Sequence, residues 1–560
     1  MTFNKVVFDI ETTMTADKIW CIVCKHGDTY YQFKEDRLHR FAELIKQTEE
    51  VIGHNIIGFD IPVVNTIFGY DVFANCKVTD TLVLSRLLNP MIEGGHSLKN
   101  WGTKLGQNKI HFEQFDFFSE DMLTYCRNDV ELTERLYKFL IKKTEDFGMS
   151  IELEHKVAQI IQKQHERGFK INVVEAYELQ SKFQEDMNNL TSKVRETFPP
   201  LKIEEEFIPK SNNKARGYVK GVPFTKVKYK EFNLGSRQQI AERLVMLGWK
   251  PKKKTDKGHI IVDEKVLSEI HNIPEAKLIN RYLMLQKRIA QVNSWIEAIK
   301  EDGRVHGKVI TNGTITGRMS HQSPNMAQIP AVYSPYGKEC RALWTVNKGY
   351  KLVGVDASGL ELRMLAHYMN DKDYIYEVVN GDIHTANQNA AGLESRDKAK
   401  TFIYAFIYGA GSKKIGSIIG GSERDGERTK EKFLRATPSL RSLREKVERV
   451  AQRRWVRGLD QRKIIIRHPH AALNTLLQGA GAIVMKYALT LLEQYVINKQ
   501  IKAFPVVNVH DEFQYEVEES RAEEFGRLAV QSIIDAGKQL NVRCPLNGEY
   551  KIGNNWSETH

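Results

Sequence analysis

Hydrophobic residues in the first 150 positions alternate with polar ones in some segments and recur at helical spacing in others. Residues 5–10 and 19–23 are short apolar runs and predict strands. Residues 121–144 carry apolar side chains three or four positions apart and predict a helix. Strands and helices mixed over one domain-sized length predict an α/β domain.

A long helical stripe follows and is stopped by Pro199 and Pro200. Its members are Leu179, Phe183, Met187, Leu190, Val194 and Phe198. Residues 201–257 change composition from acidic to strongly basic, and both a solvated loop and a DNA-contacting loop stay open. The remaining predictions are a helix over 275–300, strands and turns over 304–360, helices over 380–455, and a helix with a β-hairpin over 460–520.

The length, charge and cysteine content of the chain limit the classes of protein to which it can belong. A chain of 560 residues predicts about three to five domains. The net charge of +12 favours a polyanionic partner, either nucleic acid or an anionic membrane surface. Six cysteines are too few for a disulfide-stapled secreted protein, and Cys21 and Cys24 are interpreted as reduced core residues. We expect a cytosolic protein without a signal peptide, because no segment approaches 18 apolar residues.

Acidic residues of the first domain form a candidate metal site. Asp9 and Glu11 are two apart in a predicted strand and so share a face. Asp60 follows in a loop-helix segment, and Tyr125 and Asp129 are four apart on a predicted helix. Carboxylates gathered in one place repel each other unless divalent cations bind among them, and two metal ions can activate water and cleave a phosphodiester.

Two aspartates of the second half are candidates for a second metal site. Asp356 ends an apolar strand, and Asp511 lies at the turn of a hairpin with alternating flanks. Two strand ends can each present one aspartate to a shared pair of magnesium ions, which is what phosphoryl transfer requires.

A helix between these aspartates carries a candidate nucleotide-binding stripe. Arg396, Lys400, Tyr404 and Tyr408 recur every four residues and therefore share one face. Two cations followed by two aromatics suit a triphosphate and then a sugar and base. A helix with a mixed face is the alternative interpretation.

The motifs resemble two known families. The set Asp9, Glu11, Asp60, Tyr125 and Asp129 is similar to the DEDD-type proofreading exonucleases of the RNase H-like fold. DASGLELR, RDKAKTFIYAFIYG and VHDE resemble motifs A, B and C of family A DNA polymerases, in the same order. TITGR, SPNMAQIP, ALNTLLQGAGA and GNNWSETH extend the similarity to the polymerases of T-seven-like bacteriophages.

The resemblance implies an α/β multidomain fold, with an RNase H-like exonuclease followed by a right-hand polymerase of thumb, palm and fingers and a palm split in sequence. The implied domains are an exonuclease over 1–146, a thumb over 147–303 with a short basic insertion at 199–231, palm parts over 304–380 and 456–560, and fingers over 381–455.

The resemblance also implies roles for individual residues. Two magnesium ions are expected at each site, held by Asp9, Glu11, Asp60 and Asp129, and by Asp356, Asp511 and the carbonyl of Ala357, with Glu512 as a supporting carboxylate. The implied nucleotide contacts are Glu361, which excludes a ribose 2′-hydroxyl, and His384, Arg396, Lys400, Tyr404 and Tyr408. The implied DNA contacts are Arg318, Arg341, Asn474, Gln478 and His510.

The expected partners are primer-template DNA, dNTPs, a phage primase-helicase and a single-stranded DNA-binding protein, in the cytoplasm of an infected bacterium and without a membrane. Thioredoxin is doubtful, because the thumb insertion is much shorter than in the similar phage enzyme. Unlike in bacterial polymerase I, we expect no 5′-nuclease domain before the exonuclease, and the resemblance implies that His470 stands where bacterial polymerase I has arginine.

Two alternatives stay open. A single-subunit RNA polymerase uses similar paired aspartates, although Glu361 and the exonuclease set disfavour it. An exonuclease with a non-catalytic DNA clamp is disfavoured by the intact polymerase motifs.

Overall fold

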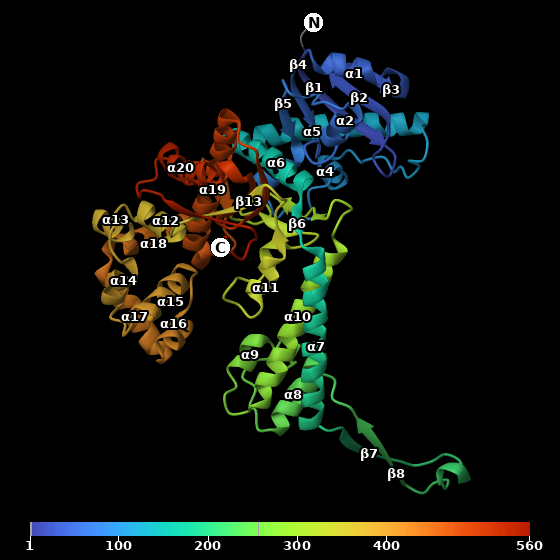
Figure 1. Cartoon of the computed structure of the whole chain (residues 1–560), viewed down its shortest axis with the longest axis vertical. Coiled ribbons are helices and arrows are strands. Elements are labelled where there is room, and N and C mark those ends of the chain that lie inside the picture. The colour runs from blue at the N-terminus through green and yellow to red at the C-terminus, as the bar shows by residue number, and fades with distance from the viewer. Residues whose placement is uncertain (1–2, 256) are drawn as a thin grey trace. The chain divides into compact units, whose positions relative to one another are not determined.

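The computed structural model describes residues 3–255 and 257–560 (Figure 1). Backbone contacts divide the chain into two compact units, described separately below. The first unit combines Met1–Lys170 with His306–His560, and the second is Ile171–Val305. The structure therefore groups residues 147–170 with the first unit, although they were expected in the thumb segment.

The N-terminal part of the first unit is built on a five-stranded sheet in the order β3-β2-β1-β4-β5. The strands are β1 (Phe3–Thr12), β2 (Ile19–His26), β3 (Thr29–Lys34), β4 (Thr48–Gly53) and β5 (Lys77–Asp80). β1 pairs antiparallel with β2 and parallel with β4. The helices are α1 (Leu38–Ile45), α2 (Asp60–Phe68), α3 (Thr81–Leu88), α4 (Leu98–Leu105) and α5 (Glu120–Lys143). The predicted strands and helix are confirmed.

Alternation along β1 explains how this sheet is covered on both faces. Val6 and Phe8 are buried in one cluster with Phe41 of α1. Val7, between them in sequence, is buried in another cluster with Met122 of α5. Because successive side chains point to opposite faces, the two helices cover opposite sides of the sheet.

A second sheet of the first unit has the order β16-β17-β13-β18, with β13 antiparallel to both its neighbours. Its strands are β13 (Tyr350–Ala357), β16 (Ala503–Val509), β17 (Glu512–Glu518) and β18 (Gly548–Gly553). The predicted strand before Asp356 and the predicted hairpin around Asp511 are confirmed. Tyr515 of β17 and Phe525 and Ile533 of α20 (Ala522–Gln539) are fully buried together.

Helices make up most of the rest of the first unit. They are α6 (Ser150–Arg167), α11 (Gly337–Ala342), α12 (Leu360–Met369), α13 (Lys372–Val379), α14 (Ile383–Ala391), α15 (Arg396–Ile407), α16 (Ser412–Ile419), α17 (Glu423–Ala436), α18 (Pro438–Ala451) and α19 (Ala472–Lys499). The short strands are β6 (Phe169–Ile171), β10 (Lys308–Ile310), β11 (Ser320–Gln322), β12 (Trp344–Thr345), β14 (Trp455–Arg457) and β15 (Lys463–Ile465).

The expectation that no segment is apolar enough to span a membrane was wrong for α19. Residues Pro469–Lys499 meet the length and composition of a membrane span, but 94% of the apolar window is buried inside the protein. α19 is therefore a core helix, apolar on all sides because other elements surround it.

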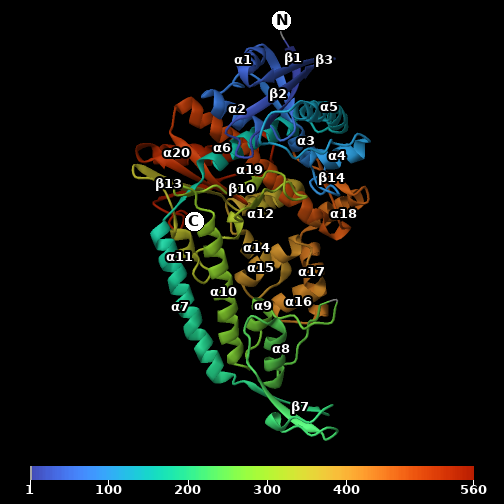
Figure 2. The same cartoon turned by 90° about the vertical axis from the view of Figure 1, so that its right-hand side faces the viewer.

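The second unit contains a pair of long helices. These are α7 (Val173–Thr197) and α10 (Glu275–Glu297), drawn side by side in Figures 1 and 2. They share a core with α8 (Arg237–Met246) and α9 (Glu264–Ser268), and the unit ends with β9 (Arg304–Val305). The predicted stripe of α7 contributes Leu179, Phe183, Leu190 and Val194 as buried residues.

The basic segment that was interpreted as a loop contains an antiparallel hairpin. Its strands are β7 (Leu201–Phe207) and β8 (Phe224–Lys230), with Leu201 opposite Lys230 and Phe207 opposite Phe224. The hairpin places acidic residues beside basic ones, and Lys228 lies 2.5 Å from Glu205. The positive charge of β8 is therefore partly neutralised within the hairpin itself.

Candidate active sites

The first cluster of candidate residues lies where β1 faces α5. Asp9 and Glu11 are on β1, Asp60 is the first residue of α2, and Asp129 is on α5. The ligand atoms of Asp9, Glu11 and Cys126 lie within 4.8 Å of one another. Asp60 and Asp129 are near enough for their charges to raise the pKa of Asp9. The structure thus brings all four predicted carboxylates together.

Burial dominates the electrostatics of this cluster. It raises the pKa of Asp9 well above its usual range, the pKa of Glu11 to about 9 and the pKa of Asp60 to about 7. Asp129 Oδ1 is buried and has no hydrogen-bond partner among the described residues. Buried carboxylates that repel one another, one with an unsatisfied oxygen, suit hard divalent cations such as Mg²⁺.

The loop before Asp60 is held by a buried carboxylate that the sequence did not single out. Asp80 accepts hydrogen bonds from the backbone N–H groups of Asn55 (2.8 Å) and Ile57 (3.1 Å). Its own N–H donates to His155 Nε2 of α6 at 2.8 Å. These bonds fix the entry into α2 and with it the position of Asp60.

The second cluster lies where β13 meets the hairpin of β16 and β17. Asp356 pairs in register with Glu512, and the N–H of Ala357 donates to the backbone oxygen of Asp511 at 3.1 Å. Desolvation, and then the charge of Asp511, raises the pKa of Asp356 to about 7. Desolvation also raises the pKa of Asp511. Two desolvated aspartates at adjacent strand ends, both with a raised pKa, fit shared divalent cations.

The carboxylate of Glu512 is held by neighbouring donors. Its Oε1 accepts from Gln514 Nε2 and Trp556 Nε1, both at 2.6 Å, and its Oε2 lies 2.8 Å from His560 Nδ1. Burial opposes its charge, but these contacts lower the pKa of Glu512. Arg341 is buried beside it, with its guanidinium over the Trp556 ring. Both residues support the wall of the site.

The predicted stripe on α15 is confirmed as a continuous face. Arg396 and Lys400 are exposed, and Tyr404 and Tyr408 follow with ring centroids 6.5 Å apart. The ring of His384 on α14 lies 6.3 Å from that of Tyr404, and its Nδ1 is buried with no hydrogen-bond partner among the described residues. The face offers cations at one end and aromatic rings at the other.

Glu361 connects this stripe to the aspartates. The hydroxyl of Tyr408 donates to both of its carboxylate oxygens, at 2.7 and 2.9 Å. Arg318 Nη2 approaches Glu361 at 3.3 Å. The charges of Glu361 and Asp511 both raise the pKa of Tyr404, after the larger effect of its burial. Glu361, Tyr404, Tyr408 and Asp511 therefore border one space.

The remaining predicted DNA contacts are on α19 and in the turn between β16 and β17. Asn474 and Gln478 are half-buried on α19, and Asn474 Oδ1 has no hydrogen-bond partner within the described chain. His510 is exposed, with a φ of 57° in the turn before Asp511. A small cavity of about 30 Å³ is bordered by Arg318, His510 and Glu512.

Comparison with known proteins agrees with this geometry. The family model "DNA polymerase family A" matches residues 217–558. A DNA-directed DNA polymerase of Enterobacteria phage T3 is 33% identical, over 99% of this chain and 100% of that protein.

This chain belongs to DNA polymerase family A.

One further relative and one solved structure are similar to this family A member. It is 35% identical to a DNA-directed DNA polymerase of Escherichia phage T7, over 87% of this chain and 88% of that protein. The solved POL domain of Pol1 from M. smegmatis, in complex with DNA primer-template and dNTP, superposes with a TM-score of 0.82 at 18% identity. That match covers 99% of this chain and 95% of the solved one.

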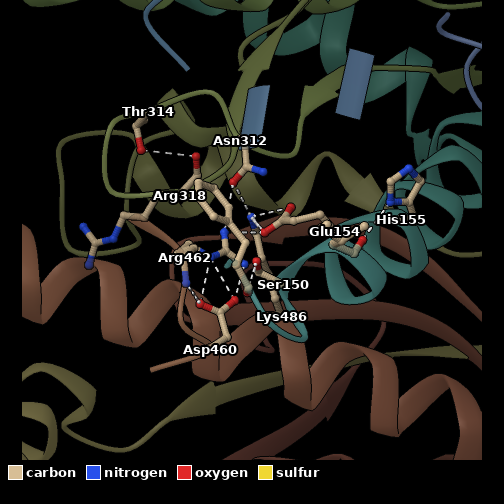
Figure 3. A network of polar contacts seen from close by, with 11 residues as sticks. Ser150, Glu154, His155, Asn312, Thr314, Arg318, Asp460, Arg462 and Lys486 are labelled. Atoms are coloured by element: carbon tan, nitrogen blue, oxygen red, sulfur yellow. Dashed lines mark hydrogen bonds and ion pairs between the residues drawn. The ribbon is translucent and has the colours of Figure 1, made fainter. Parts of the chain in front are cut away.

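A buried network anchors the turn that carries Arg318 in this family A chain (Figure 3). Asn312 Oδ1 accepts a hydrogen bond from Lys486 Nζ at 2.8 Å, and Lys486 also contacts Glu154 at 2.7 Å. Arg462 contacts Glu154 at 2.5 Å and Asp460 at 2.6 Å. A backbone hydrogen bond joins the two ends of the turn: the N–H of residue 313 donates to the backbone oxygen of residue 318 at 3.2 Å.

Sequence reasoning missed this network and one residue of the first cluster. Lys486 interrupts the apolar run of α19, and a lysine buried in a core helix requires a partner of opposite charge. This lysine was the one sign of the network that the sequence contained. Lys109 lies 2.5 Å from Asp129 in a segment without helix or strand, where no periodicity marks it.

Proposed function

We propose that this chain extends a DNA primer on a template and removes nucleotides from the same 3′ end at a separate site. The observation that carries the proposal is the presence of two distinct carboxylate clusters, one of which borders the cationic and aromatic face of α15. Membership of DNA polymerase family A supports the first activity. The geometry around Asp9, Glu11, Asp60 and Asp129 supports the second.

The polymerase reaction assigns a task to each part of the second cluster. Bound Mg²⁺ ions would lower the pKa of the primer 3′-hydroxyl and stabilise the charge of the triphosphate. Asp356, Asp511 and the carbonyl of Ala357 would hold them. Arg396, Lys400 and His384 would bind the triphosphate, and Tyr404 and Tyr408 would contact the sugar and the templating base.

We assign Arg318, Gln478 and His510 to contacts with the minor-groove edge of the base pair at the primer end. We assign Asn474 to a contact with the template strand. Minor-groove acceptors are nearly the same for all base pairs, so these residues would test pair shape without selecting a sequence. Arg341 is buried beside Glu512, and we assign it to supporting the wall of the site.

The first cluster would perform hydrolysis. Asp9, Glu11, Asp60 and Asp129 would hold two Mg²⁺ ions, and Tyr125 on the same face of α5 as Asp129 would orient the attacking water. The products would be a nucleoside monophosphate and a primer shorter by one nucleotide.

The experiment that tests this function is primer extension with dNTPs or NTPs as substrates. We expect extension to the template end with dNTPs and little with NTPs. Extension with NTPs alone would favour a single-subunit RNA polymerase. Digestion without extension under either condition would favour an exonuclease with a DNA clamp.

Glu361→Ala is expected to relax selection against ribonucleotides. The carboxylate is fixed by Tyr408 and Arg318 at the border of the nucleotide space, where its bulk and its hydrogen bonding oppose a 2′-hydroxyl. Losing such a contact changes discrimination by about 10-fold or more. The measurement is the dNTP/NTP ratio of kcat/KM, with Asp397→Ala as an exposed control on α15, and an unchanged ratio for Glu361→Ala would refute this role.

Tyr404→Phe is expected to make the enzyme reject dideoxynucleotides that the wild type accepts. The phenolic hydroxyl can replace the hydrogen bond that a missing 3′-hydroxyl would have made. The measurement is the ddNTP/dNTP ratio of incorporation for the two proteins. Strong ddNTP rejection by the wild type would show that Tyr404 lies elsewhere in the bound complex.

The region between β7 and β8 is expected to hold DNA through its exposed basic residues. Lys214, Arg216 and Lys220 are exposed there, whereas Lys228 is paired with Glu205. Neutralising the first three should weaken DNA binding and reduce the salt dependence, because fewer counterions are released. Lys228→Gln is the matched control with a smaller expected effect. Unchanged affinity and salt slope in the triple variant would contradict this role.

Thioredoxin is expected to leave processivity nearly unchanged. The hairpin and its connection are short, and a stable interface buries roughly 800 Å² on each partner. The measurement is product length per binding event with and without thioredoxin. A large thioredoxin-dependent increase would overturn this expectation.

A further inference from the structure

Lys109 lies within the first carboxylate cluster. Its Nζ is 2.5 Å from Asp129 Oδ2 and 4.7 Å from the centre of the Tyr125 ring. Its side chain is 25% exposed, whereas that of Asp129 is 4% exposed. A cation thus contacts the same carboxylate whose other oxygen, Oδ1, has no hydrogen-bond partner in the described part of the chain.

The charge of Lys109 reaches three of the four carboxylates of the cluster. It lowers the pKa values of Asp9, Glu11 and Asp129, opposing the burial that raises them. Divalent cations in the site would exert the same kind of effect more strongly. Lys109 and a metal ion at Asp129 therefore act on the same carboxylates and repel each other.

The backbone that follows Lys109 is anchored at two points. The N–H of Ile110 donates to Asn128 Oδ1 of α5 at 3.2 Å, and Trp20 Nε1 donates to the backbone oxygen of Phe115 at 2.9 Å. Phe112 stacks on Tyr125 with ring centres 5.3 Å apart. A lysine side chain is a flexible chain of four methylene groups that ends in the ammonium. The ammonium can therefore leave Asp129 for solvent without any movement of this anchored backbone.

We propose that Lys109 is an internal counter-cation of the first site: it contacts Asp129 in the metal-free protein, must release it when a divalent cation binds there, and so sets the metal affinity of the site. The proposal rests on the proposed exonuclease function. Lys109 is a positioning residue, because it acts through Asp129 and not on the DNA.

The test compares Mn²⁺ binding to Lys109→Met and Lys109→Arg in the absence of DNA. Both changes are made in the full chain carrying Asp356→Ala and Asp511→Ala, so that titration calorimetry reports the first site. Removing a positive charge within roughly 5 Å of a divalent ion should raise Mn²⁺ affinity by at least about 10-fold. Lys109→Arg keeps the charge and should stay within about threefold of the parent protein.

Lys34→Met is the matched control. Lys34 also contacts a carboxylate, that of Glu120 at 2.7 Å, but both side chains are exposed and outside the cluster. This variant should bind Mn²⁺ as the parent does. If Lys109→Met does not fold, as judged by circular dichroism, Lys109→Gln replaces it in the same titration.

Unchanged or weaker Mn²⁺ binding in folded Lys109→Met would overturn the proposal. A lower exonuclease kcat with unchanged Mn²⁺ affinity would also overturn it, since that result indicates a contact with DNA. Failure of the proposed function is distinguishable: the parent chain would then degrade no DNA, although Lys109→Met could still bind Mn²⁺ more tightly.

Discussion

Asp356→Asn and Asp511→Asn are each expected to lower the rate of primer extension by at least about 10³-fold. Asparagine keeps the size of the side chain but removes the charge that would hold divalent cations in the proposed reaction. The two aspartates lie at adjacent strand ends, and each contributes to the same site. The measurement is single-nucleotide incorporation on a primed template under conditions where the enzyme exceeds the DNA.

The same variants should retain 3′→5′ digestion of single-stranded DNA, because Asp9 and Glu11 belong to a different sheet. Asp9→Ala combined with Glu11→Ala should give the reverse pattern. Asp373→Asn, an exposed carboxylate on α13, is the control and should change neither activity. Loss of both activities from either change, in a folded protein, would disprove two separate sites.

Arg462→Met is expected to lower the free energy of unfolding by about 3–5 kcal/mol, because it leaves the buried carboxylate of Asp460 without its partner and removes one of the two cations beside Glu154. The Arg462 and Glu154 side chains are 4% and 0% exposed, and the Asp460 side chain is fully buried. Methionine has a similar length but cannot compensate their charge. The measurement is equilibrium unfolding in urea.

Lys163→Met provides the matched control for this prediction. Lys163 lies 2.6 Å from Glu493, but its side chain is 58% exposed, so water screens the pair. Its loss should cost less than about 1 kcal/mol. A similar cost for both variants would show that the buried network does not stabilise the turn that carries Arg318.

Local sequence patterns were sufficient to predict the carboxylate clusters and the helical stripe. Asp9 and Glu11 follow from the alternation of a strand, and Arg396, Lys400 and Tyr404 follow from the repeat of a helix. Each of these patterns depends on neighbours within one element. The structure confirms β1, α5, α15 and the hairpin around Asp511 for this reason.

Contacts between distant residues could not be predicted in the same way. Glu154 and Lys486 are 332 positions apart, and only the folded chain brings them together. Lys109 acts from a segment without regular structure, which has no periodicity to interpret. The hairpin of β7 and β8 was missed because almost all its side chains are exposed, so the alternation of Val227 and Tyr229 with lysines along β8 does not mark a buried face.

The most direct test of two opposed activities in one chain is the conversion of dNTP to dNMP on a primed template. Only the dNTP that pairs with the next template base is supplied, so the enzyme can add one nucleotide, remove it and add it again. The supplied dNTP carries a label in its base, so that dNMP formed from it is distinguished from dNMP cut from the primer. The account predicts steady conversion of labelled dNTP to labelled dNMP, which requires the primed template and stops in both Asp356→Asn and the Asp9→Ala, Glu11→Ala variant. Absence of labelled dNMP with the wild type, or its continued formation in either variant, would contradict the account.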